Sequence, residues 1–278
     1  MRKREAEGKS DVTADLFAIR SVLFLPASNP RAIAKARESS ADMVVLDLED
    51  AVKPEDKEMA RAAAVDAVAD DWPMPVAIRI NGRGSEWYGL DLLAMTHSKA
   101  PFIVVPRAES RDELHDARSH SGRPVAAMIE TARGVLAAAS IAPEATALIA
   151  GTNDLRADLR LPLDSTREPI SASLQLILLA ARAAGIPAFD GVFNKLADPD
   201  GFAAECADGR RLGFDGKSLI HPDQIEPCNR LFAPSTAEVE RARKLVEAFS
   251  GGAERFEDAM IERMHVEAAR RVLQRANS

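Results

Sequence analysis

The sequence predicts an α/β protein, a TIM (β/α)₈ barrel with a C-terminal helical extension. Three observations predict this fold: eight short apolar runs alternate with eight helical stretches, the runs are almost continuously apolar, and none is followed by a Gly-x-Gly-x-x-Gly motif. Continuous apolar runs are typical of parallel strands covered on both faces. Alternation over eight units favours a closed barrel over an open doubly wound sheet, and the missing motif weakens the dinucleotide-binding alternative.

The expected strands are the apolar runs themselves, at residues 21–25, 43–48, 76–80, 102–105, 125–129, 147–150, 186–189 and 218–220. The expected helices are rich in Ala, Arg, Glu and Leu, at residues 30–39, 55–70, 86–95, 110–119, 133–142, 168–184, 199–211 and 222–232. Pro and Gly mark the joins, as at Pro101 and Gly213, because neither residue favours the interior of a helix or strand.

Three segments make up the expected domain organisation. Residues 1–18 begin with a charged stretch that lacks the apolar segment of a signal peptide, so they read as a disordered tail. The barrel takes residues 19–234. Helical patterns at 235–249 and 255–275 exceed what closing a barrel requires. We expect the extension, residues 235–278, to pack on the barrel or on a neighbouring subunit.

Composition narrows the class of protein. The chain has 278 residues, 46% of them hydrophobic, and a formal net charge of −7. This charge argues against a nucleic-acid partner or an anionic membrane surface. No run approaches the roughly 18 apolar residues of a membrane helix. Cys206 and Cys228 lack metal-binding spacing and form no disulfide framework, which favours a cytoplasmic protein.

Glu130 and Asp154 are the most informative residues in the chain. Each follows an apolar run, and they stand in neighbouring strand–helix units. Adjacent parallel strands would bring both carboxylates to the C-terminal mouth of the barrel, where the active sites of such barrels lie. Hard divalent cations such as Mg²⁺ prefer oxygen ligands and often use one or two carboxylates. The pair therefore predicts a metal site, although Asp154 could instead cap the turn that follows it.

Other polar residues stand at neighbouring strand ends. Asp47 and Glu49 share one face of the second strand, where they could hydrogen-bond metal-bound waters or pair with nearby cations. Arg79, inside an apolar run, suits bidentate binding of a substrate carboxylate or enolate oxygen; an internal salt bridge with Asp47 or Glu49 is the alternative. Backbone N–H groups of the glycine-containing turn Gly151-Thr152-Asn153 could hold a carboxylate.

Several motifs together resemble the citrate lyase β-subunit family, the group of Mg²⁺-dependent C–C lyases that includes malyl-CoA and citramalyl-CoA lyases. The resemblance spans roughly residues 20–275. Its motifs are Arg20-Ser21-Val22-Leu23-Phe24-Leu25-Pro26, Leu46-Asp47-Leu48-Glu49-Asp50, Arg79-Ile80-Asn81, Ile129-Glu130-Thr131, Asp154-Leu155, Asp190-Gly191-Val192, Gly213-Phe214-Asp215-Gly216-Lys217 and Ile220-His221-Pro222.

The resemblance implies Mg²⁺ on Glu130 and Asp154, Arg79 on the oxo-acid portion of the substrate, and Arg20 near the acyl thioester or its phosphates. Position along the strand opposes the last of these, since Arg20 stands before the first expected strand. The family also implies a trimer or hexamer. Its tail often reads Met-Ile-Asp-x-Pro, with the Asp as a candidate acid/base group for a neighbouring site. Here that Asp position is Glu262 and the Pro position is Met264.

The expected function is cleavage or formation of a 3-hydroxyacyl thioester such as citramalyl-, malyl- or citryl-CoA, with Glu262 or a metal-bound water transferring the proton. With Glu262 at this position the identity of the acyl substrate is not fixed, because one extra methylene moves a carboxylate by about an ångström. Two alternatives remain. One is an aldolase for a free 2-oxo-4-hydroxy acid without CoA, and the other is a low-activity lyase subunit that needs a partner complex.

Overall fold

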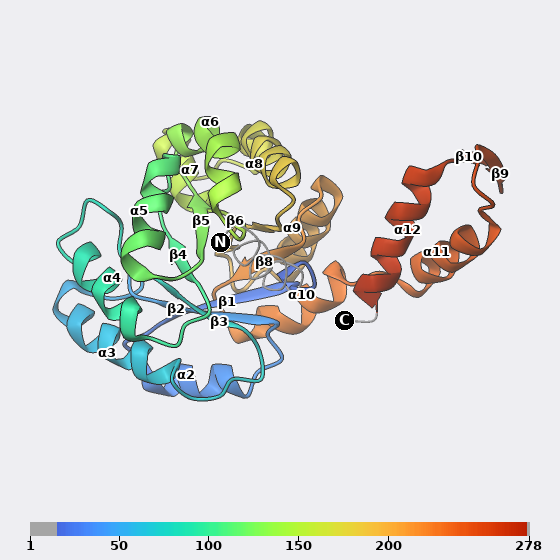
Figure 1. Cartoon of the computed structure of the whole chain (residues 1–278). Coiled ribbons are helices and arrows are strands. Elements are labelled where there is room, and N and C mark those ends of the chain that lie inside the picture. Colours follow the sequence, from blue (N-terminus) through green and yellow to red (C-terminus); the bar gives the residue numbers. More distant parts are fainter. Residues whose placement is uncertain (1–15, 277–278) are drawn as a thin grey trace, which may run out of the picture. The chain divides into compact units, whose positions relative to one another are not determined.

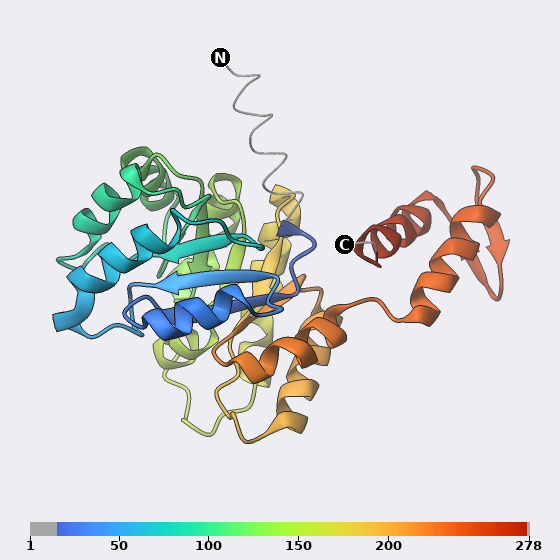
Figure 2. The same ribbon diagram turned by 90° about the horizontal axis from the view of Figure 1, so that it is seen from below.

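A closed barrel of eight parallel strands forms the first part of the chain and confirms the predicted fold (Figure 1). The computed structural model describes residues 16–276. They fall into two compact units, one ending at Asn229 and the other beginning at Arg230. The strands run in sequence order around the barrel, and the eighth pairs with the first. Helices lie outside the strands, as the two views show (Figures 1 and 2).

The strands of the barrel are β1 (Ser21–Pro26), β2 (Met43–Asp47), β3 (Val76–Arg79), β4 (Ile103–Val105), β5 (Val125–Ile129), β6 (Leu148–Ala150), β7 (Ala188–Asp190) and β8 (Gly216–Leu219). The helices of this unit are α2 (Pro30–Arg37), α3 (Lys57–Ala67), α4 (Tyr88–His97), α5 (Arg111–Ser121), α6 (Ala132–Ile141), α7 (Thr152–Asp158), α8 (Ser171–Ala184), α9 (Pro199–Leu212) and α10 (Ile225–Phe232), whose last residues belong to the second unit. Short 3₁₀ turns are η1 (Pro54–Asp56), η2 (Ala142–Glu144), η3 (Glu168–Ile170) and η4 (Pro222–Gln224).

Side-chain caps fix where the helices begin and end. Ser110 and Thr131 each accept a hydrogen bond from the backbone N–H three residues further on, at the start of α5 and α6. Such caps satisfy N–H groups that have no partner inside the helix. α8 and α9 end at Gly185 and Gly213, whose positive φ angles favour glycine. The loops that follow the strands therefore start from fixed positions.

Alternation along the strands fills the barrel interior. Val45, Ala77, Ala126, Ile149 and Phe189 belong to one buried apolar cluster. Every second residue of a strand faces the same side, so Asp47 and Arg79 face the barrel interior as Val45 and Ala77 do. Asp47 and Arg79 are neighbours in the register of β2 and β3. The same period on β5 leads from Ala126 through Met128 to Glu130. Polar residues are thus added to the top of an apolar core, at the carboxyl ends of the strands.

The first described residue, Leu16, already belongs to the core of the barrel. Residues 1–15 of the predicted tail lie outside the described residues, but Leu16 is buried and belongs to the core cluster. Leu16 therefore packs with the barrel although it lies within the expected tail of residues 1–18. One helix was also missed, because α7 has only seven residues and no long apolar pattern.

The second unit consists of helices and one hairpin. It contains α11 (Thr236–Ala248), the antiparallel strands β9 (Glu254–Phe256) and β10 (Ala259–Ile261), and α12 (Arg263–Ala276). α11 and α12 pack against each other. The hairpin corrects the prediction of one helix over 255–275, since its strands are too short to produce an alternating pattern. Among residues 16–276, no helix is long and apolar enough to cross a bilayer.

Candidate active site

Glu130 lies at the carboxyl end of β5 and is almost fully buried, with 3% of its surface exposed. Its Oε1 accepts a hydrogen bond from the backbone N–H of Arg107 at 2.7 Å. A Cβ on Gly151 would overlap the Glu130 side chain, so glycine is required there for the two strand ends to approach. Burial and the nearby charge of Asp154 raise the pKa of Glu130 to about 7. An added cation would relieve both effects.

Asp154 lies in the first turn of α7, directly after β6. Its Oδ1 stands 3.7 Å from Nη1 of Arg107, and its side chain is 42% exposed. Burial raises the pKa of Asp154, and the charge of Asp50 raises it further. Asp154 thus lies in the first turn of α7 with the Arg107 guanidinium as its nearest charged partner, and its side chain also accepts a hydrogen bond from its own backbone N–H, so a local role in the turn stays an alternative.

Glu130 and Asp154 open into one cavity of about 360 Å³. The predicted substrate-binding turn Gly151-Thr152-Asn153 lines the same cavity, as do Arg79 and Asp47. The remaining lining residues are Phe24, Leu25, Pro26, Asp50, Ala51, Met128, Ala150, Val192, Asn194, Ser218 and Ile220. The structure thus brings together the carboxylate pair and most of the predicted site around one mouth.

Arg79 forms the internal salt bridge that was the alternative to substrate binding. Its Nε and Nη2 donate to the two Asp47 oxygens, both at 2.6 Å, and Nη1 lies 3.1 Å from Oε2 of Glu49. Burial alone would lower the pKa of Arg79, but Asp47 and Glu49 hold it above its ordinary value. Arg79 still borders the cavity, with its bidentate face turned to Asp47.

Asp47 is occupied by several donors, and Glu49 is not. Asp47 also accepts hydrogen bonds from the backbone N–H groups of Glu49 and Ala51. Oε2 of Glu49 is buried and has no hydrogen bond of good geometry, despite its proximity to Arg79. Burial raises the pKa of Glu49 to about 8. Glu49 does not line the cavity of Glu130 and Asp154 but borders a neighbouring one, whereas Asp47 lines the cavity of the pair with both of its oxygens already hydrogen-bonded.

Arg20 lies apart from the cavity of Glu130 and Asp154, and its predicted contact with the substrate stays a prediction. Arg20 precedes β1, at the amino ends of the strands, opposite the mouth. Its Nε and Nη2 bind both oxygens of Asp42 at 2.8 and 2.9 Å. It is not among the residues that line the cavity. Its position before β1 explains this separation, since residues at the carboxyl ends of β1 and β8 line the cavity.

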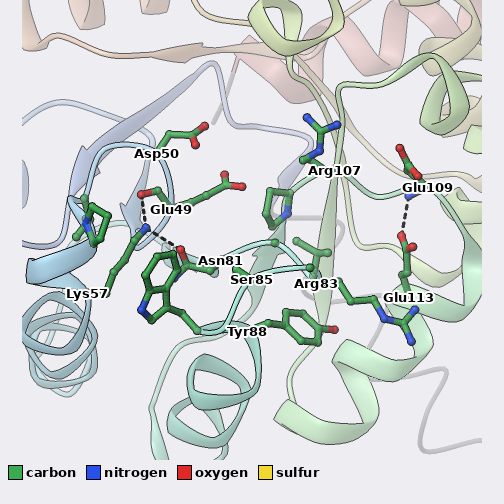
Figure 3. A pocket seen from close by; sticks show the side chains of 17 residues that line it. Glu49, Asp50, Lys57, Asn81, Arg83, Ser85, Tyr88, Arg107, Glu109 and Glu113 are labelled. Atoms are coloured by element: carbon green, nitrogen blue, oxygen red, sulfur yellow. Dashed lines mark hydrogen bonds between the residues drawn. The ribbon is translucent and has the colours of Figure 1, made fainter. Parts of the chain in front are cut away.

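A second cavity of about 680 Å³ adjoins the first, and Figure 3 shows its side chains. Asp50 lines both cavities. Lys57 is buried beneath it and donates to the backbone oxygens of Leu48 and Glu49, both at 2.6 Å, and to Oδ1 of Asn81 at 2.7 Å. Burial lowers the pKa of Lys57. Lys57 thereby fixes the chain that leads from β2 to Asp50.

Asp50, Arg107 and Lys57 line these cavities, and sequence reasoning assigned them no role. Asp50 and Arg107 stand at strand ends, which was a usable signal. Arg107 adopts a positive φ of 47°, uncommon for a residue with a side chain. Lys57 gave no signal of its own, because a lysine in a helical stretch is usually exposed.

The donor set fits a hard divalent cation that takes two carboxylates from the protein. Among residues 16–276, no group of three or more His, Cys, Asp or Glu is arranged to hold a metal. Glu130 and Asp154 would hold it, and oxygens of water and substrate would complete the shell, as is usual for Mg²⁺. Such a cation would lower the pKa values of the two carboxyl groups, which are raised without it.

Known proteins are similar to this chain over most of its length. The family model described as HpcH/HpaI aldolase/citrate lyase matches residues 20–222. A (3S)-malyl-CoA thioesterase from Cereibacter sphaeroides is 40% identical over 270 residues, which cover 93% of this chain and 95% of the relative. The citrate lyase subunit beta from Leuconostoc mesenteroides subsp. cremoris is 34% identical and covers 93% of each chain.

Solved structures of similar proteins share the fold of this chain. The crystal structure of CitE from Mycobacterium tuberculosis, in complex with magnesium, acetoacetate and coenzyme A, superposes with a TM-score of 0.83 at 32% identity. That similarity covers 94% of this chain and 100% of the CitE chain. RipC from Yersinia pestis follows with a TM-score of 0.71 at 33% identity, over 80% of this chain and 99% of its own. From the family match over residues 20–222 and the identity with these relatives, the chain belongs to the HpcH/HpaI aldolase/citrate lyase family.

Proposed function

We propose that the protein is a Mg²⁺-dependent C–C lyase for a 3-hydroxyacyl thioester of the malyl- or citramalyl-CoA type. The observation that carries this proposal is the pair Glu130 and Asp154, which share one cavity with Asp47 and the salt-bridged Arg79. Relatives are crystallised with magnesium and with coenzyme A or small oxo acids, which supports both the metal and the ligand class.

The bond changes of this reaction place clear demands on the site. The 3-hydroxyl group loses its proton, the bond between carbons 2 and 3 breaks, and the electron pair passes to the thioester as an enolate. Carbon 2 of that enolate then takes up a proton, which gives an acyl-CoA and a 2-oxo acid. Mg²⁺, when bound, supplies a Lewis acid that polarises substrate oxygens.

The residues of the chain have separate tasks in this proposal. Glu130 and Asp154 hold the cation, and the cavity orients the oxo-acid end of the substrate. Arg79 places a permanent positive charge at the cavity wall, which favours a substrate carboxylate or a developing oxyanion. Glu262, exposed after β10 in the second unit, is the proposed proton-transfer group. We further propose a cytoplasmic homo-oligomer, in which Glu262 serves a neighbouring copy.

Hydrolysis of the thioester is a second candidate, favoured by the 40% identity with (3S)-malyl-CoA thioesterases. In that reaction water adds to the thioester carbonyl carbon, the C–S bond breaks, and the CoA thiol leaves with a proton. The same cavity serves both reactions, since they share the thioester and the hydroxy acid. Glu262 in place of Asp is a further reason to weigh hydrolysis against C–C cleavage.

Product analysis with purified protein separates these functions. We expect (3S)-malyl-CoA or citramalyl-CoA with Mg²⁺ to give acetyl-CoA and glyoxylate or pyruvate. Free CoA thiol with malate or citramalate would instead assign hydrolysis. Turnover of a free 2-oxo-4-hydroxy acid without CoA would assign the aldolase, and absence of turnover would leave the partner-dependent subunit. Loss of products with Glu130→Gln, but not with the exposed Glu58→Gln on α3, would tie the reaction to the carboxylate pair.

A further inference from the structure

A cluster of charged residues lies on the outer side of β7 and β8, two of them fully buried and three partly exposed, and the proposed chemistry does not use it. We call it the Lys217 cluster; it comprises Arg167, Asp190, Glu205, Asp208 and Lys217. Nζ of Lys217 lies 2.7 Å from Oε1 of Glu205 and 3.3 Å from Oδ2 of Asp190. Arg167 bridges Asp190 at 2.8 Å and Asp208 at 2.9 Å.

Lys217 and Asp190 are both completely buried, which makes their pairing obligatory. They are register neighbours on β8 and β7. Burial alone would lower the pKa of Lys217, but Asp190 and Glu205 hold it above its ordinary value. Removing one partner from such a group leaves an uncompensated charge in the interior. A cluster of this kind fixes the chain around it with little freedom.

The chain that the cluster fixes is the carboxyl end of β7. Nζ of Lys217 donates to the backbone oxygen of Gly191 at 2.6 Å. The backbone N–H of Gly191 is 2.8 Å from Oδ1 of Asp190. The N–H and the carbonyl oxygen of Gly191 are therefore both hydrogen-bonded to members of the Lys217 cluster. Val192, the next residue, lines the cavity of the proposed metal site.

Gly191 in turn determines where α7 begins. A Cβ on Gly191 would overlap the Oγ1, Cγ2 and Cβ atoms of Thr152, so the Gly191 backbone and the Thr152 side chain are in close contact. Thr152 is buried and is the first residue of α7. The same helix carries Asp154 one half-turn later. Displacement of Gly191 would therefore displace the proposed metal ligand.

A second contact joins the same two segments. Nδ2 of Asn194 donates to Oδ1 of Asn153 at 2.7 Å, and Nδ2 of Asn153 lies 3.4 Å from Oδ1 of Asn194. The backbone oxygen of Phe193 accepts from Gln224 at 2.9 Å. The loop 191–194 thus contacts the first two residues of α7. Lys217 and Gln224 in turn hold the loop through its backbone oxygens.

We propose that Lys217 is a positioning residue for the metal site: through Gly191 and Thr152 it sets where α7 starts and where the Asp154 carboxylate points. This inference rests on the proposed function, because it takes Asp154 as a ligand of the cation. Residues that orient metal ligands without touching the metal commonly change metal affinity by about 10–100-fold when altered.

Mn²⁺ binding, followed by the electron paramagnetic resonance signal of the free ion, tests the proposal without using activity. We expect Lys217→Met to weaken Mn²⁺ binding by about tenfold or more in protein that retains wild-type circular dichroism. Gly191→Ala is the second variant; it leaves every charge of the Lys217 cluster in place and pushes directly on Thr152. We expect the same loss of affinity, and partial recovery when Thr152→Gly is added to make room.

Gly89→Ala is the matched control, because a Cβ at Gly89 meets nothing within 4 Å. Unchanged Mn²⁺ affinity in folded Gly191→Ala, or in folded Lys217→Met, would overturn the proposal. If Lys217→Met does not fold, Gly191→Ala decides alone. Failure of the proposed function looks different: wild-type protein would then bind no Mn²⁺, or Glu130→Gln would bind it equally well, and the positioning role would fall with the metal site.

Discussion

The backbone N–H of Arg107 donates a 2.7 Å hydrogen bond to Oε1 of Glu130. The side chain of the same residue approaches Asp154, with 3.7 Å between Nη1 and Oδ1. Arg107 therefore has two separable roles: its main chain orients one carboxylate, and its guanidinium partly neutralises the other. Its backbone adopts the left-handed region, with φ 47°.

Arg107→Gly separates these roles. Glycine keeps the N–H and accommodates a positive φ at no steric cost, while the cation that competes with a metal at Asp154 is removed. We expect Mg²⁺ binding to become a few-fold tighter, a modest effect because both side chains are half-exposed and solvent screens their charges. Isothermal titration calorimetry measures it, with Arg107→Lys as the charge-retaining control. Weaker binding in Arg107→Gly would refute this role of the guanidinium.

Metal affinity should depend on pH. The pKa of Glu130 is raised to about 7, so below that pH a proton competes with Mg²⁺ for the same carboxylate. We expect the affinity to rise as the pH increases through about 7 and then to level off. Calorimetric titrations in buffers of different ionisation enthalpy should show proton release near neutral pH. Affinity that stays constant from about pH 6 to 8 would contradict the burial argument for Glu130.

Stability of the metal-free protein should move in the opposite direction. The pKa values of Glu130 and Glu49 are raised to about 7 and about 8, above those of an unfolded chain. The folded state then binds more protons than the unfolded state, so the contribution of these groups to stability falls as pH rises through these values. We expect the Tm in EDTA to be lower at pH 8 than at pH 6, and the difference to shrink in Glu130→Gln. An equal dependence in that variant would exclude Glu130 as a cause.

The salt bridge between Arg79 and Asp47 should matter for stability as well as for the site. Arg79→Met leaves the buried Asp47 carboxylate without its bidentate partner. We expect a loss of about 3–5 kcal/mol in the free energy of unfolding, the usual cost of one unpaired buried charge. Urea denaturation measures it, and Asp47→Leu added to Arg79→Met should restore part of the loss. A single-variant loss of under about 1 kcal/mol would show that Asp47 finds other compensation.

Much of the fold and the carboxylate pair could be predicted from the sequence, for a physical reason. Continuous apolar runs define parallel strands, and the end of each run defines the mouth, so position alone predicts that Glu130 and Asp154 share one cavity. Loop conformation has no such period. The positive φ of Arg107 and the buried bonds of Lys57 depend on tertiary contacts, and so they could not be read from the residues that carry them.

The other differences have equally local causes. Arg79 had two chemically sensible partners, and only the register of β2 against β3 places it beside Asp47. Arg20 belongs to a family motif, but its place before β1 puts it at the other end of the barrel. The hairpin β9–β10 stands between two helical patterns, and three-residue strands leave no periodic signal.

Glu262 offers a test of how the tail influences the reaction. Shortening Glu262→Asp withdraws the carboxylate by one methylene, to the side chain typical of the family pattern. We expect the ratio of acetyl-CoA to free CoA thiol formed from malyl-CoA to rise, because proton transfer in C–C cleavage depends on the position of the carboxylate. Glu257→Asp, on the exposed turn of the same hairpin, is the control. An unchanged product ratio would remove Glu262 from the proposed chemistry.

The central claim is that Glu130 and Asp154 together form one Mg²⁺ site. Calorimetric titration of Mg²⁺ into wild-type protein, Glu130→Gln and Asp154→Asn at pH 8 tests it most directly, with Glu58→Gln as the surface control. The account predicts one site per chain in the wild type and the control, and loss of that site in each of the two carboxylate variants. Mg²⁺ binding of unchanged affinity and stoichiometry in either Glu130→Gln or Asp154→Asn would contradict it.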